Sequence, residues 1–461
     1  MNYRKRVVIL GAGYAGIILA TRLDKKISSK ITLVDANKYH DLIQQAHLVA
    51  GGIKKEEEAR YKIPDIIENS NIQFIQSIVK KIKADEKTVI VEDNKRIEYD
   101  FLVVALGATT QSFGIKNINK YCLTLHSIDD ALAIKNKIQN LIDKNNNNNN
   151  KFKSDKIKAE KKQKGEDHIV IVGGGPTGTG ISGTISEFIN KSGQTSGKIK
   201  ITLVTASPTI LQNWNKRMID EATKILEKKG VNILTNSLVK GVNEDSIILD
   251  NGQEISSSLI IWTPGVKGFE LPFEPDVEKT RDQRIVINEY CQINKFPDIF
   301  CIGDIAGVRD TSGEGKIKYP PLGQIAISQA IYLAETIPEF FLKEKKPTEK
   351  FDYDVKINIL PMGEDDYIGT IDGKFVKGKI AKILKEFRYK SYKEEIASDK
   401  ININNILYTD DSVSNLLLGI SIGSVIPNKS FEKDTFKTQK EKEDNDVHHK
   451  VKDILHKSKH I

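Results

Sequence analysis

The sequence predicts an α/β fold with two separate parallel-sheet units, and three observations carry this prediction. The stretch "VVILGAGYAGIILATRL" at 7–23 has the pattern of a buried strand, a glycine-rich turn and a helix, and "KITLVD" at 30–35 supplies the next strand. The same order recurs in "IVIVGGGPTGTGISGTISEF" at 169–188, followed by "KITLVT" at 200–205. The length of 461 residues exceeds one ordinary domain and predicts two or three.

Composition narrows the class of protein. The formal charge of +8 rests mostly on lysine, yet no compact basic reading motif points to nucleic acid, so we expect none as a partner. An anionic lipid surface explains the charge more economically, and a coding bias toward lysine and asparagine is the alternative. The N-terminus enters the first strand at once, which leaves no room for a signal peptide. Apolar runs stay below the roughly 18 to 20 residues of a spanning helix, so we expect a soluble or peripheral protein.

Three cysteines, Cys122, Cys291 and Cys301, form an odd set without CxxC spacing. This argues against a disulfide scaffold, a zinc site or a thiol-pair redox motif, and it suits a reducing compartment. We predict no metal site.

The first glycine motif, "GAGYAG", has Gly11, Gly13 and Gly16 in its first, third and sixth places. The first permits the tight turn, the second lets the backbone approach a pyrophosphate, and the third allows close helix–strand packing. Asp35 ends the next strand at the expected distance, where a carboxylate can accept hydrogen bonds from ribose hydroxyls. The full order of strand, glycines, helix, strand and acid predicts a Rossmann-like dinucleotide site.

Two later segments complete a site for FAD. "YDFLVVALGA" at 99–108 places Ala105 and Gly107 where the backbone passes close to the nucleotide. "FPDIFCIGDIAG" at 296–307 ends a strand at Gly303 and Asp304, whose carboxylate and N–H can hold the ribityl chain and the pyrophosphate. These segments resemble the flavoprotein reductases with two dinucleotide-binding domains and a glutathione-reductase-like fold. That resemblance runs from about residue 5 to 340 and implies a second cradle inserted into a split FAD domain.

The second cradle, "GGGPTG", keeps the phosphate-binding glycines Gly173, Gly175 and Gly178, and its following strand ends in Thr205. An acid at that strand end would select NADH, and no arginine stands beside it to attract the 2′-phosphate of NADPH. The choice between NADH and NADPH is therefore open.

The second cradle also resembles that of the type II NADH dehydrogenases, the single-chain quinone reductases of respiratory membranes. Those enzymes carry glutamates where this chain has Gly180 and Thr184, and the first position lies near the nicotinamide–flavin contact in the family. Whether this nucleotide site is productive without acids at 180, 184 and 205 is left open by the sequence.

The acceptor side lacks the redox cysteine that related reductases carry. The segment "NKYHDLIQQAHLVAGG" at 37–52 contains no cysteine, which disfavours disulfide chemistry. We interpret its His40 and His47 as loop and helix histidines whose hydrogen bonds are satisfied within the protein, rather than as flavin contacts.

"YPPLGQIAISQAIYLAETI" at 319–337 resembles the quinone-side helix of the type II enzymes, and Gln324 and Gln329 match its glutamines. We expect them to share one helix face and to donate to a quinone or flavin oxygen without adding charge.

A basic amphipathic helix is predicted within 373–396. We expect Val376, Ile380, Ile383, Leu384 and Phe387 to form one apolar stripe, flanked by lysines and by interfacial tyrosines at 389 and 392. Periodicity alone suits a helix on the core or a dimer partner equally well, and the family resemblance favours a membrane surface. Lys385 matches a family lysine near the quinone site.

The sequence therefore predicts an FAD-dependent, non-proton-pumping NAD(P)H:quinone oxidoreductase on the inner, cytoplasmic face of the cell membrane. A homodimer is compatible with the sequence. A sulfide:quinone oxidoreductase-like enzyme and a flavin-binding module with an inactive nucleotide site are the alternatives. The predicted segments are 1–142 and 266–350 (FAD domain), 143–168 (low-complexity insertion), 169–265 (NAD(P)H domain), 351–427 (C-terminal membrane-association region) and 428–461 (charged disordered tail). Within the nucleotide domain we expect a helix at 215–230 and a hairpin turn at Asn251–Gly252.

Overall fold

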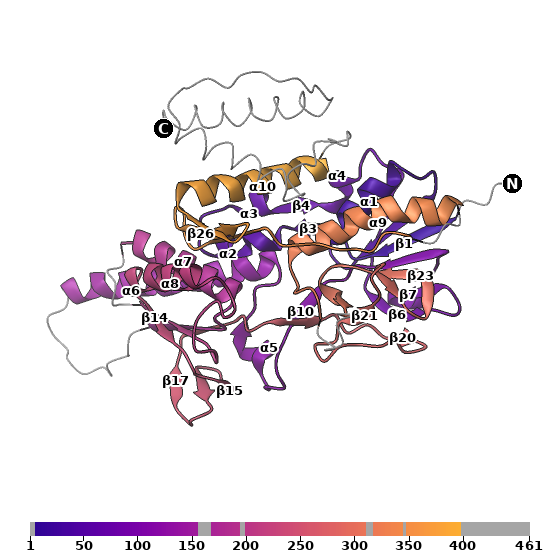
Figure 1. Cartoon of the computed structure of the whole chain (residues 1–461). Coiled ribbons are helices and arrows are strands. Elements are labelled where there is room, and N and C mark those ends of the chain that lie inside the picture. Colours follow the sequence, from indigo (N-terminus) through magenta and orange to yellow (C-terminus); the bar gives the residue numbers. More distant parts are fainter. Residues whose placement is uncertain (1–4, 155–166, 194–198, 310–316, 344–346, 398–461) are drawn as a thin grey trace, which may run out of the picture. The chain divides into compact units, whose positions relative to one another are not determined.

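The structure is a computed structural model that describes residues 5–154, 167–193, 199–309, 317–343 and 347–397 (Figure 1). Its α-helices are α1 (Tyr14–Asp24), α2 (Ala46–Ala50), α3 (Glu56–Ala59), α4 (Ile63–Ile66), α5 (Ile118–Tyr121), α6 (Ile128–Ser154), α7 (Pro176–Lys191), α8 (Lys216–Lys228), α9 (Gly323–Lys343) and α10 (Lys379–Ala397). Short 3₁₀ turns are η1 (Ile43–Gln45), η2 (Glu92–Asn94) and η3 (Gly303–Ile305). In the described part of the chain, none of the helices is long and apolar enough to cross a bilayer.

The first large sheet has six strands in the order β22 (Gln292–Ile293), β23 (Phe296–Cys301), β9 (Phe101–Val104), β1 (Arg6–Leu10), β2 (Lys30–Asp35) and β5 (Gln73–Gln76). All neighbours from β23 to β5 pair in parallel, whereas β22 pairs antiparallel at one edge. The continuous apolar run of β9 is buried along its whole length, as expected for a parallel sheet that is covered on both faces. Helices α1 and α9 pack against each other beside this sheet (Figure 1).

The second large sheet has five parallel strands in the order β11 (Cys122–Leu123), β18 (Leu259–Trp262), β12 (Asp167–Val172), β13 (Ile199–Val204) and β14 (Val231–Leu234). Isoleucines of β12 and α7 lie in one buried cluster with residues of α6 and α8. The apolar core of this unit therefore sits between the sheet and its helices. The predicted helix at 215–230 is α8, which Asn215 caps by accepting a hydrogen bond from the Arg217 N–H.

Smaller sheets and strand pairs, most of them antiparallel, accompany the two large sheets. The remaining strands are β3 (Tyr39–Asp41), β4 (Arg60–Lys62), β6 (Val79–Lys83), β7 (Thr88–Val91), β8 (Arg96–Glu98), β10 (Ala108–Thr110), β15 (Val239–Val242), β16 (Ser246–Leu249), β17 (Glu254–Ser256), β19 (Val266–Gly268), β20 (Phe273–Glu274), β21 (Ile285–Ile287), β24 (Ala306–Val308), β25 (Ile357–Pro361), β26 (Tyr367–Ile371) and β27 (Lys374–Lys377). The predicted Asn251–Gly252 turn joins the antiparallel pair β16 and β17, with Gly252 at φ +84°.

Three predicted segments, the insertion, the C-terminal region and the tail, lie partly or wholly outside the described residues. Helix α6 continues through the start of the predicted insertion as far as Ser154, and residues 155–166 lie outside the described residues. The ammonium group of Lys144 on α6 lies 2.9 Å from the Asp167 carboxylate at the start of β12, which ties the two ends of that segment together. The predicted tail at 428–461 and the part of the C-terminal region from 398 onward also lie outside the described residues.

Candidate functional site

The first glycine motif sits where the parallel strands of the six-stranded sheet end. Gly11 follows β1 with φ +99°, and a β-carbon there would lie 2.4 Å from the carbonyl oxygen of Ala105, which follows β9. A β-carbon on Gly16 would lie 1.8 Å from the Gly11 carbonyl oxygen. Only glycine fits at these two positions, because side chains there would collide with backbone. The turn and helix α1 are therefore packed as a dinucleotide cradle requires.

Asp35 lies at the same edge of the sheet. One of its carboxylate oxygens accepts a hydrogen bond from the Ala12 N–H at 2.7 Å, and the other accepts one from the Asn37 N–H at 2.7 Å. Burial raises the pKa of this carboxyl above its usual value, and the two backbone donors oppose that rise. Each oxygen can accept a further hydrogen bond, which suits the ribose hydroxyls predicted for it.

Gly303 and Asp304 follow β23 and form the start of η3 on the same edge. The N–H of Gly303 donates to Oε1 of Gln329 on α9 at 2.7 Å. Burial raises the pKa of Asp304 to about 6, and the nearby Arg284 guanidinium partly offsets this effect. The structure thus brings Gly11, Asp35, Ala105 and Asp304 together from residues far apart in sequence, because all follow strands of one parallel sheet.

The residues at this edge fit FAD. A β-carbon on Gly13 or on Gly107 would meet no described atom within 4 Å, apart from those of its chain neighbours and its own helix backbone, so the backbone is open for a ligand to approach. Four buried side-chain polar atoms of the described residues have no hydrogen-bond partner, and two of them, Oε1 of Gln45 and Nε2 of His47, belong to the segment that follows Asp35. Buried polar atoms of this kind normally find a partner, and a bound cofactor offers hydrogen-bonding groups.

The second cradle repeats the geometry of the first. Gly173 follows β12 with φ +108°, and a β-carbon there would lie 2.7 Å from the Pro264 nitrogen beyond β18. A β-carbon on Gly178 would lie 1.8 Å from the Gly173 carbonyl oxygen, the same relation as between Gly16 and Gly11. A β-carbon on Gly175 would meet no described atom within 4 Å outside its immediate chain surroundings, so the N-terminus of α7 is open to a phosphate.

Thr205 follows β13 and is buried, with 6% of its surface exposed. Its hydroxyl accepts a hydrogen bond from the Ser207 N–H at 3.3 Å. The loop then turns back over the cradle, because the Leu211 N–H donates to the Gly174 carbonyl at 2.7 Å. The strand end that would carry a nucleotide-selecting acid therefore holds a small, buried and uncharged side chain.

The positions of the absent glutamates lie where α7 meets α2 and the C-terminal sheet. A β-carbon on Gly180 would lie 3.1 Å from Cδ2 of His47 and 3.2 Å from the Pro361 carbonyl oxygen. The Thr184 hydroxyl donates to the His47 carbonyl at 2.9 Å. Small side chains at these two positions allow α2 and β25 to approach α7 closely.

The two histidines of the thiol-free segment differ. His40 is satisfied, as predicted, because its ring nitrogens lie 2.8 Å from the Ala12 carbonyl oxygen and 2.9 Å from the Tyr392 hydroxyl. The prediction is wrong for His47, because its Nε2 has no partner of hydrogen-bond geometry among the described residues. Burial lowers the pKa of His47 to about 3, with a further lowering by Lys385 and Lys54 and an opposing effect of the Pro361 backbone.

Lys385 lies in a cluster of charged and aromatic side chains on α10. Although the residue keeps some exposed surface, its ammonium group is buried, and burial lowers its pKa to about 7. The Arg388 guanidinium lowers that pKa further, and the Glu386 carboxylate raises it. The ammonium nitrogen lies 5.2 Å from the ring centre of Tyr389, and that of Lys54 lies 4.6 Å from the same ring.

The two predicted glutamines of α9 occupy different environments. Gln329 is 2% exposed and holds the Gly303 N–H, whereas Gln324 is half-buried beside Gly323, which contacts Gln44. Five residues at about 100° each separate their directions by roughly 140°, so the expectation that they share one helix face is wrong. Gln329 supports the first cradle, and Gln324 is the glutamine with exposed surface.

The predicted apolar stripe of the basic helix is split in the structure. Val376 belongs to β27, because α10 begins only at Lys379. Leu384 packs inward, as do Tyr389 and Tyr392, which are 8% and 4% exposed rather than interfacial. Ile380 is 58% exposed, so the outward apolar face consists of Ile380 with the half-buried Ile383 and Phe387.

All three cysteines are free and buried. Burial raises the pKa of each thiol, and for Cys301 the neighbouring Cys291 adds to that rise. Raised pKa values favour the neutral thiol over the nucleophilic thiolate at each of the three positions.

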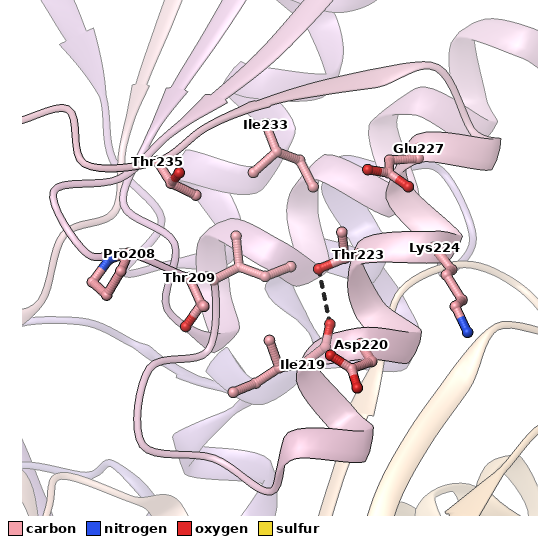
Figure 2. A pocket seen from close by; sticks show the side chains of 10 residues that line it. Pro208, Thr209, Ile219, Asp220, Thr223, Lys224, Glu227, Ile233 and Thr235 are labelled. Carbon is pink, nitrogen blue, oxygen red and sulfur yellow. Dashed lines mark hydrogen bonds between the residues drawn. The ribbon is translucent and has the colours of Figure 1, made fainter.

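A surface groove of about 490 Å³ lies on the nucleotide domain, between α8, β14 and the loop after β13 (Figure 2). Apolar side chains of Ile219 and Ile233 line it, while Asp220, Lys224 and Glu227 carry its charges. Two carboxylates against one ammonium group disfavour an anionic nucleotide there. None of the predicted site residues lines this groove, and we do not assign it to the nucleotide site.

Comparisons with known proteins agree with this geometry. Residues 5–330 match the family described as pyridine nucleotide-disulphide oxidoreductase. A Staphylococcus aureus protein named type II NADH:quinone oxidoreductase is 30% identical over 395 residues, which cover 83% of this chain and 94% of that protein.

Two solved structures share the fold. NDH2 from Plasmodium falciparum, solved in complex with NADH, has a TM-score of 0.75 at 18% identity and covers 90% of this chain and 98% of its own. The sulfide:quinone oxidoreductase of Aquifex aeolicus has a TM-score of 0.70 at 20% identity and covers 85% and 91%. The predicted α/β fold with two dinucleotide cradles is confirmed.

Proposed function

The chain belongs to the pyridine nucleotide-disulphide oxidoreductase family, and from this premise we propose that it is an FAD-dependent, non-proton-pumping NAD(P)H:quinone oxidoreductase of the type II kind. The predicted kinship with type II NADH dehydrogenases is confirmed by the staphylococcal relative. One observation carries the proposal. Two cradles of matching geometry, at Gly11 and Gly173, occur beside a segment 37–52 that has no redox cysteine.

The residues fall into three groups, which would bind the flavin cofactor, the electron donor NAD(P)H and the electron acceptor. The first cradle, Asp35, Ala105 and Asp304 would hold FAD, which, when bound, takes a hydride equivalent from the nicotinamide and passes two electrons to a quinone. The second cradle would hold the phosphates of NAD(P)H on the N-terminus of α7. Gly107 and Gly303 would let the backbone approach the flavin nucleotide.

The acceptor side would be formed by α9 and α10. Quinone reduction by NAD(P)H consumes one proton from the protein or solvent. Burial lowers the pKa of Lys385 to about 7, so its ammonium group can give and regain that proton near neutral pH. The amide of Gln324 can donate to a quinone oxygen without placing a charge in an apolar site.

A sulfide:quinone oxidoreductase-like activity is the alternative, because the Aquifex aeolicus structure shares the fold. Sulfide chemistry of that kind needs reactive cysteines over the flavin. The pKa values of Cys122, Cys291 and Cys301 are all raised by burial, so the nucleophilic thiolate is disfavoured at each. This observation favours the pyridine nucleotide as electron donor.

An anaerobic mixing experiment tests the proposal and its alternatives. The holoprotein is mixed with NADH, NADPH or sulfide while the absorbance of oxidised flavin is followed. Rapid bleaching by a pyridine nucleotide, and recovery of the absorbance on adding a quinone, is the expected result. Bleaching by sulfide alone would establish the alternative enzyme, and no bleaching by any donor would leave a flavin-binding module with an inactive nucleotide site.

We further propose that α10 rests on an anionic membrane surface, on the inner, cytoplasmic face of the cell membrane. Support comes from the exposed Ile380 and the half-buried Ile383 and Phe387 beside lysines of the same helix. Ile380→Asp should weaken sedimentation with vesicles containing anionic lipid, while Lys224→Met on α8, which also lowers the net charge by one, serves as the charge-change control. If Ile380 instead covers a second copy in a homodimer, the variant would change the mass in solution and leave vesicle binding intact.

A further inference from the structure

A chain of hydrogen bonds joins α10 to the first glycine turn. The Tyr392 hydroxyl on α10 lies 2.9 Å from Nε2 of His40, and Nδ1 of His40 lies 2.8 Å from the Ala12 carbonyl oxygen. The N–H of Ala12 in turn donates to Asp35 at 2.7 Å. Ala12 stands between the first two glycines of the cradle. Its backbone carbonyl is held by the His40 side chain, and its backbone N–H is held by the Asp35 side chain.

The direction of these hydrogen bonds follows from the chemistry of the groups. A carbonyl oxygen only accepts, so Nδ1 of His40 must carry the proton and donate to Ala12. Nε2 is then an acceptor, and the Tyr392 hydroxyl is the donor. His40 and Tyr392 are 1% and 4% exposed, and burial lowers the pKa of His40 to about 4. The imidazole is therefore neutral at physiological pH, and one arrangement of protons prevails.

Further contacts hold α10 against α1 at the same place. The Tyr14 ring, which belongs to the glycine motif itself, lies 4.8 Å from the Tyr392 ring centre and 5.6 Å from that of His40. The guanidinium of Arg22 on α1 lies 2.9 Å from the Glu395 carboxylate on α10, with both side chains at or below 10% exposure. Aromatic packing and a buried ion pair thus fix the helix over the cradle.

We propose that Tyr392 and His40 are positioning residues for FAD, so that the seating of α10 on α1 sets the affinity of the first cradle for the cofactor. The Tyr392 hydroxyl orients His40, and His40 holds the Ala12 peptide whose N–H orients Asp35. Without the tyrosine hydroxyl, Nε2 of His40 becomes a buried acceptor with no hydrogen bond, and the imidazole is free to turn away from Ala12. By thermodynamic linkage, FAD binding should also hold α10 in place.

The test measures FAD affinity in the absence of nucleotide and quinone. Holoprotein is diluted, and the fluorescence of released flavin is measured at equilibrium for wild type and Tyr392→Phe. The variant keeps the ring that packs on Tyr14 and loses only the donor. We expect its dissociation constant for FAD to rise about tenfold, and His40→Phe, which removes both hydrogen bonds, to raise it further.

Tyr389→Phe is the matched control. Tyr389 lies on the same helix with 8% exposure, but its hydroxyl donates to the Gln44 carbonyl at 3.3 Å and not to the cradle. Its FAD dissociation constant should stay within twofold of wild type. Far-UV circular dichroism in excess FAD verifies that each variant is folded.

An unchanged FAD affinity in Tyr392→Phe, or an equal loss in Tyr389→Phe, would overturn the inference. The inference rests on the FAD site of the proposed function, but its test does not depend on oxidation of NAD(P)H or reduction of quinone. Flavin release is measured whether or not NAD(P)H reduces the protein, so failure of the oxidoreductase proposal is seen separately.

Discussion

Cδ2 of His47 lies 3.1 Å from the place that a β-carbon on Gly180 would occupy. A side chain at position 180 and the imidazole of His47 therefore compete for one space between α7 and α2. The resemblance to the type II enzymes implies a glutamate at this position in that family. In this chain the position is glycine, and the buried imidazole of His47 faces it from α2.

Two glycines on α7 should differ in their tolerance of alanine. A β-carbon on Gly183 would lie 2.3 Å from the Met362 carbonyl oxygen, which is backbone and cannot turn aside. Gly183→Ala should therefore lower the free energy of unfolding by about 2 to 3 kcal/mol. Gly180→Ala meets the His47 ring at 3.1 Å and the Pro361 carbonyl oxygen at 3.2 Å, and both contacts are relieved by a shift of a few tenths of an ångström. Alanine gains about 1 kcal/mol in a helix, so the change should stay within about 1 kcal/mol.

Chemical denaturation in saturating FAD measures both free energies. An equal loss in the two variants would mean that the His47 ring and the Pro361 carbonyl cannot make the small shift that the alanine at position 180 requires.

Substitutions of the two glutamines of α9 should have different effects, one on FAD binding and the other on quinone reduction. Gln329→Leu leaves the Gly303 N–H without its acceptor, which typically costs about 1 to 3 kcal/mol, so FAD affinity should fall about tenfold. Gln324→Leu should slow flavin reoxidation by quinone and leave flavin reduction by NAD(P)H within twofold of wild type. Stopped-flow measurement of the two half-reactions provides the readout. Equal slowing of both half-reactions in Gln324→Leu would remove this residue from the quinone site.

Nucleotide selection should respond to a carboxylate at the end of β13. Thr205 is uncharged, and neither NADH nor NADPH meets a carboxylate there. Thr205→Asp places a negative charge where it would repel a 2′-phosphate and accept hydrogen bonds from free ribose hydroxyls. The ratio of kcat/KM for NADH over NADPH should rise at least fivefold. Thr209→Asp, in the surface groove, controls for added charge, and an unchanged ratio in Thr205→Asp would place the adenosine ribose elsewhere.

Both cradles could be predicted from sequence because their requirements are local. Gly16 packs against the backbone of Gly11, five residues earlier, and Gly178 packs in the same way against Gly173. The spacing of the glycines in the sequence is therefore enough to predict this local geometry. Strand ends such as those before Asp35 and Asp304 could be assembled because parallel strands finish at one edge of a sheet. Helix α8 was predictable to within two residues at each end, since its cap and stop signals lie in the sequence itself.

The contacts of α10 could not be predicted in this way. Tyr392 and His40 are 352 residues apart, and nothing in their local sequence indicates that they meet. Helical periodicity finds an apolar stripe but does not distinguish the face that packs on the core from the face that is exposed. Leu384 and Ile380 therefore look equivalent in the sequence. In the structure Leu384 is buried and Ile380 is exposed. The hydrogen bond of Gln329 could not be predicted for the same reason, because its partner Gly303 follows β23 and does not belong to α9.

Acid should destabilise the protein partly through His47. Burial lowers its pKa in the folded state to about 3, against about 6.5 in the unfolded chain. The unfolded state thus binds more protons between these values, so stability is full above pH 6.5 and is lost as pH falls toward 3. His47→Gln does not titrate. Between pH 7.5 and 5.0 the wild type should lose about 2 kcal/mol more than the variant, measured by denaturant titration. Equal losses would mean that His47 becomes protonated without unfolding.

Lys385 should impose a pH dependence on quinone reduction. Its pKa is lowered to about 7 chiefly by burial and then by Arg388, so the ammonium form prevails below pH 7 and the neutral amine above it. If the ammonium group delivers the proton, flavin reoxidation by quinone should slow above pH 7 in the wild type. Lys385→Met should be slower throughout and should lack this inflection. Lys382→Met is the matched control, because Lys382 lies on the same helix and pairs with Asp365 at 2.8 Å. An inflection near pH 7 that persists in Lys385→Met would assign the proton to another group.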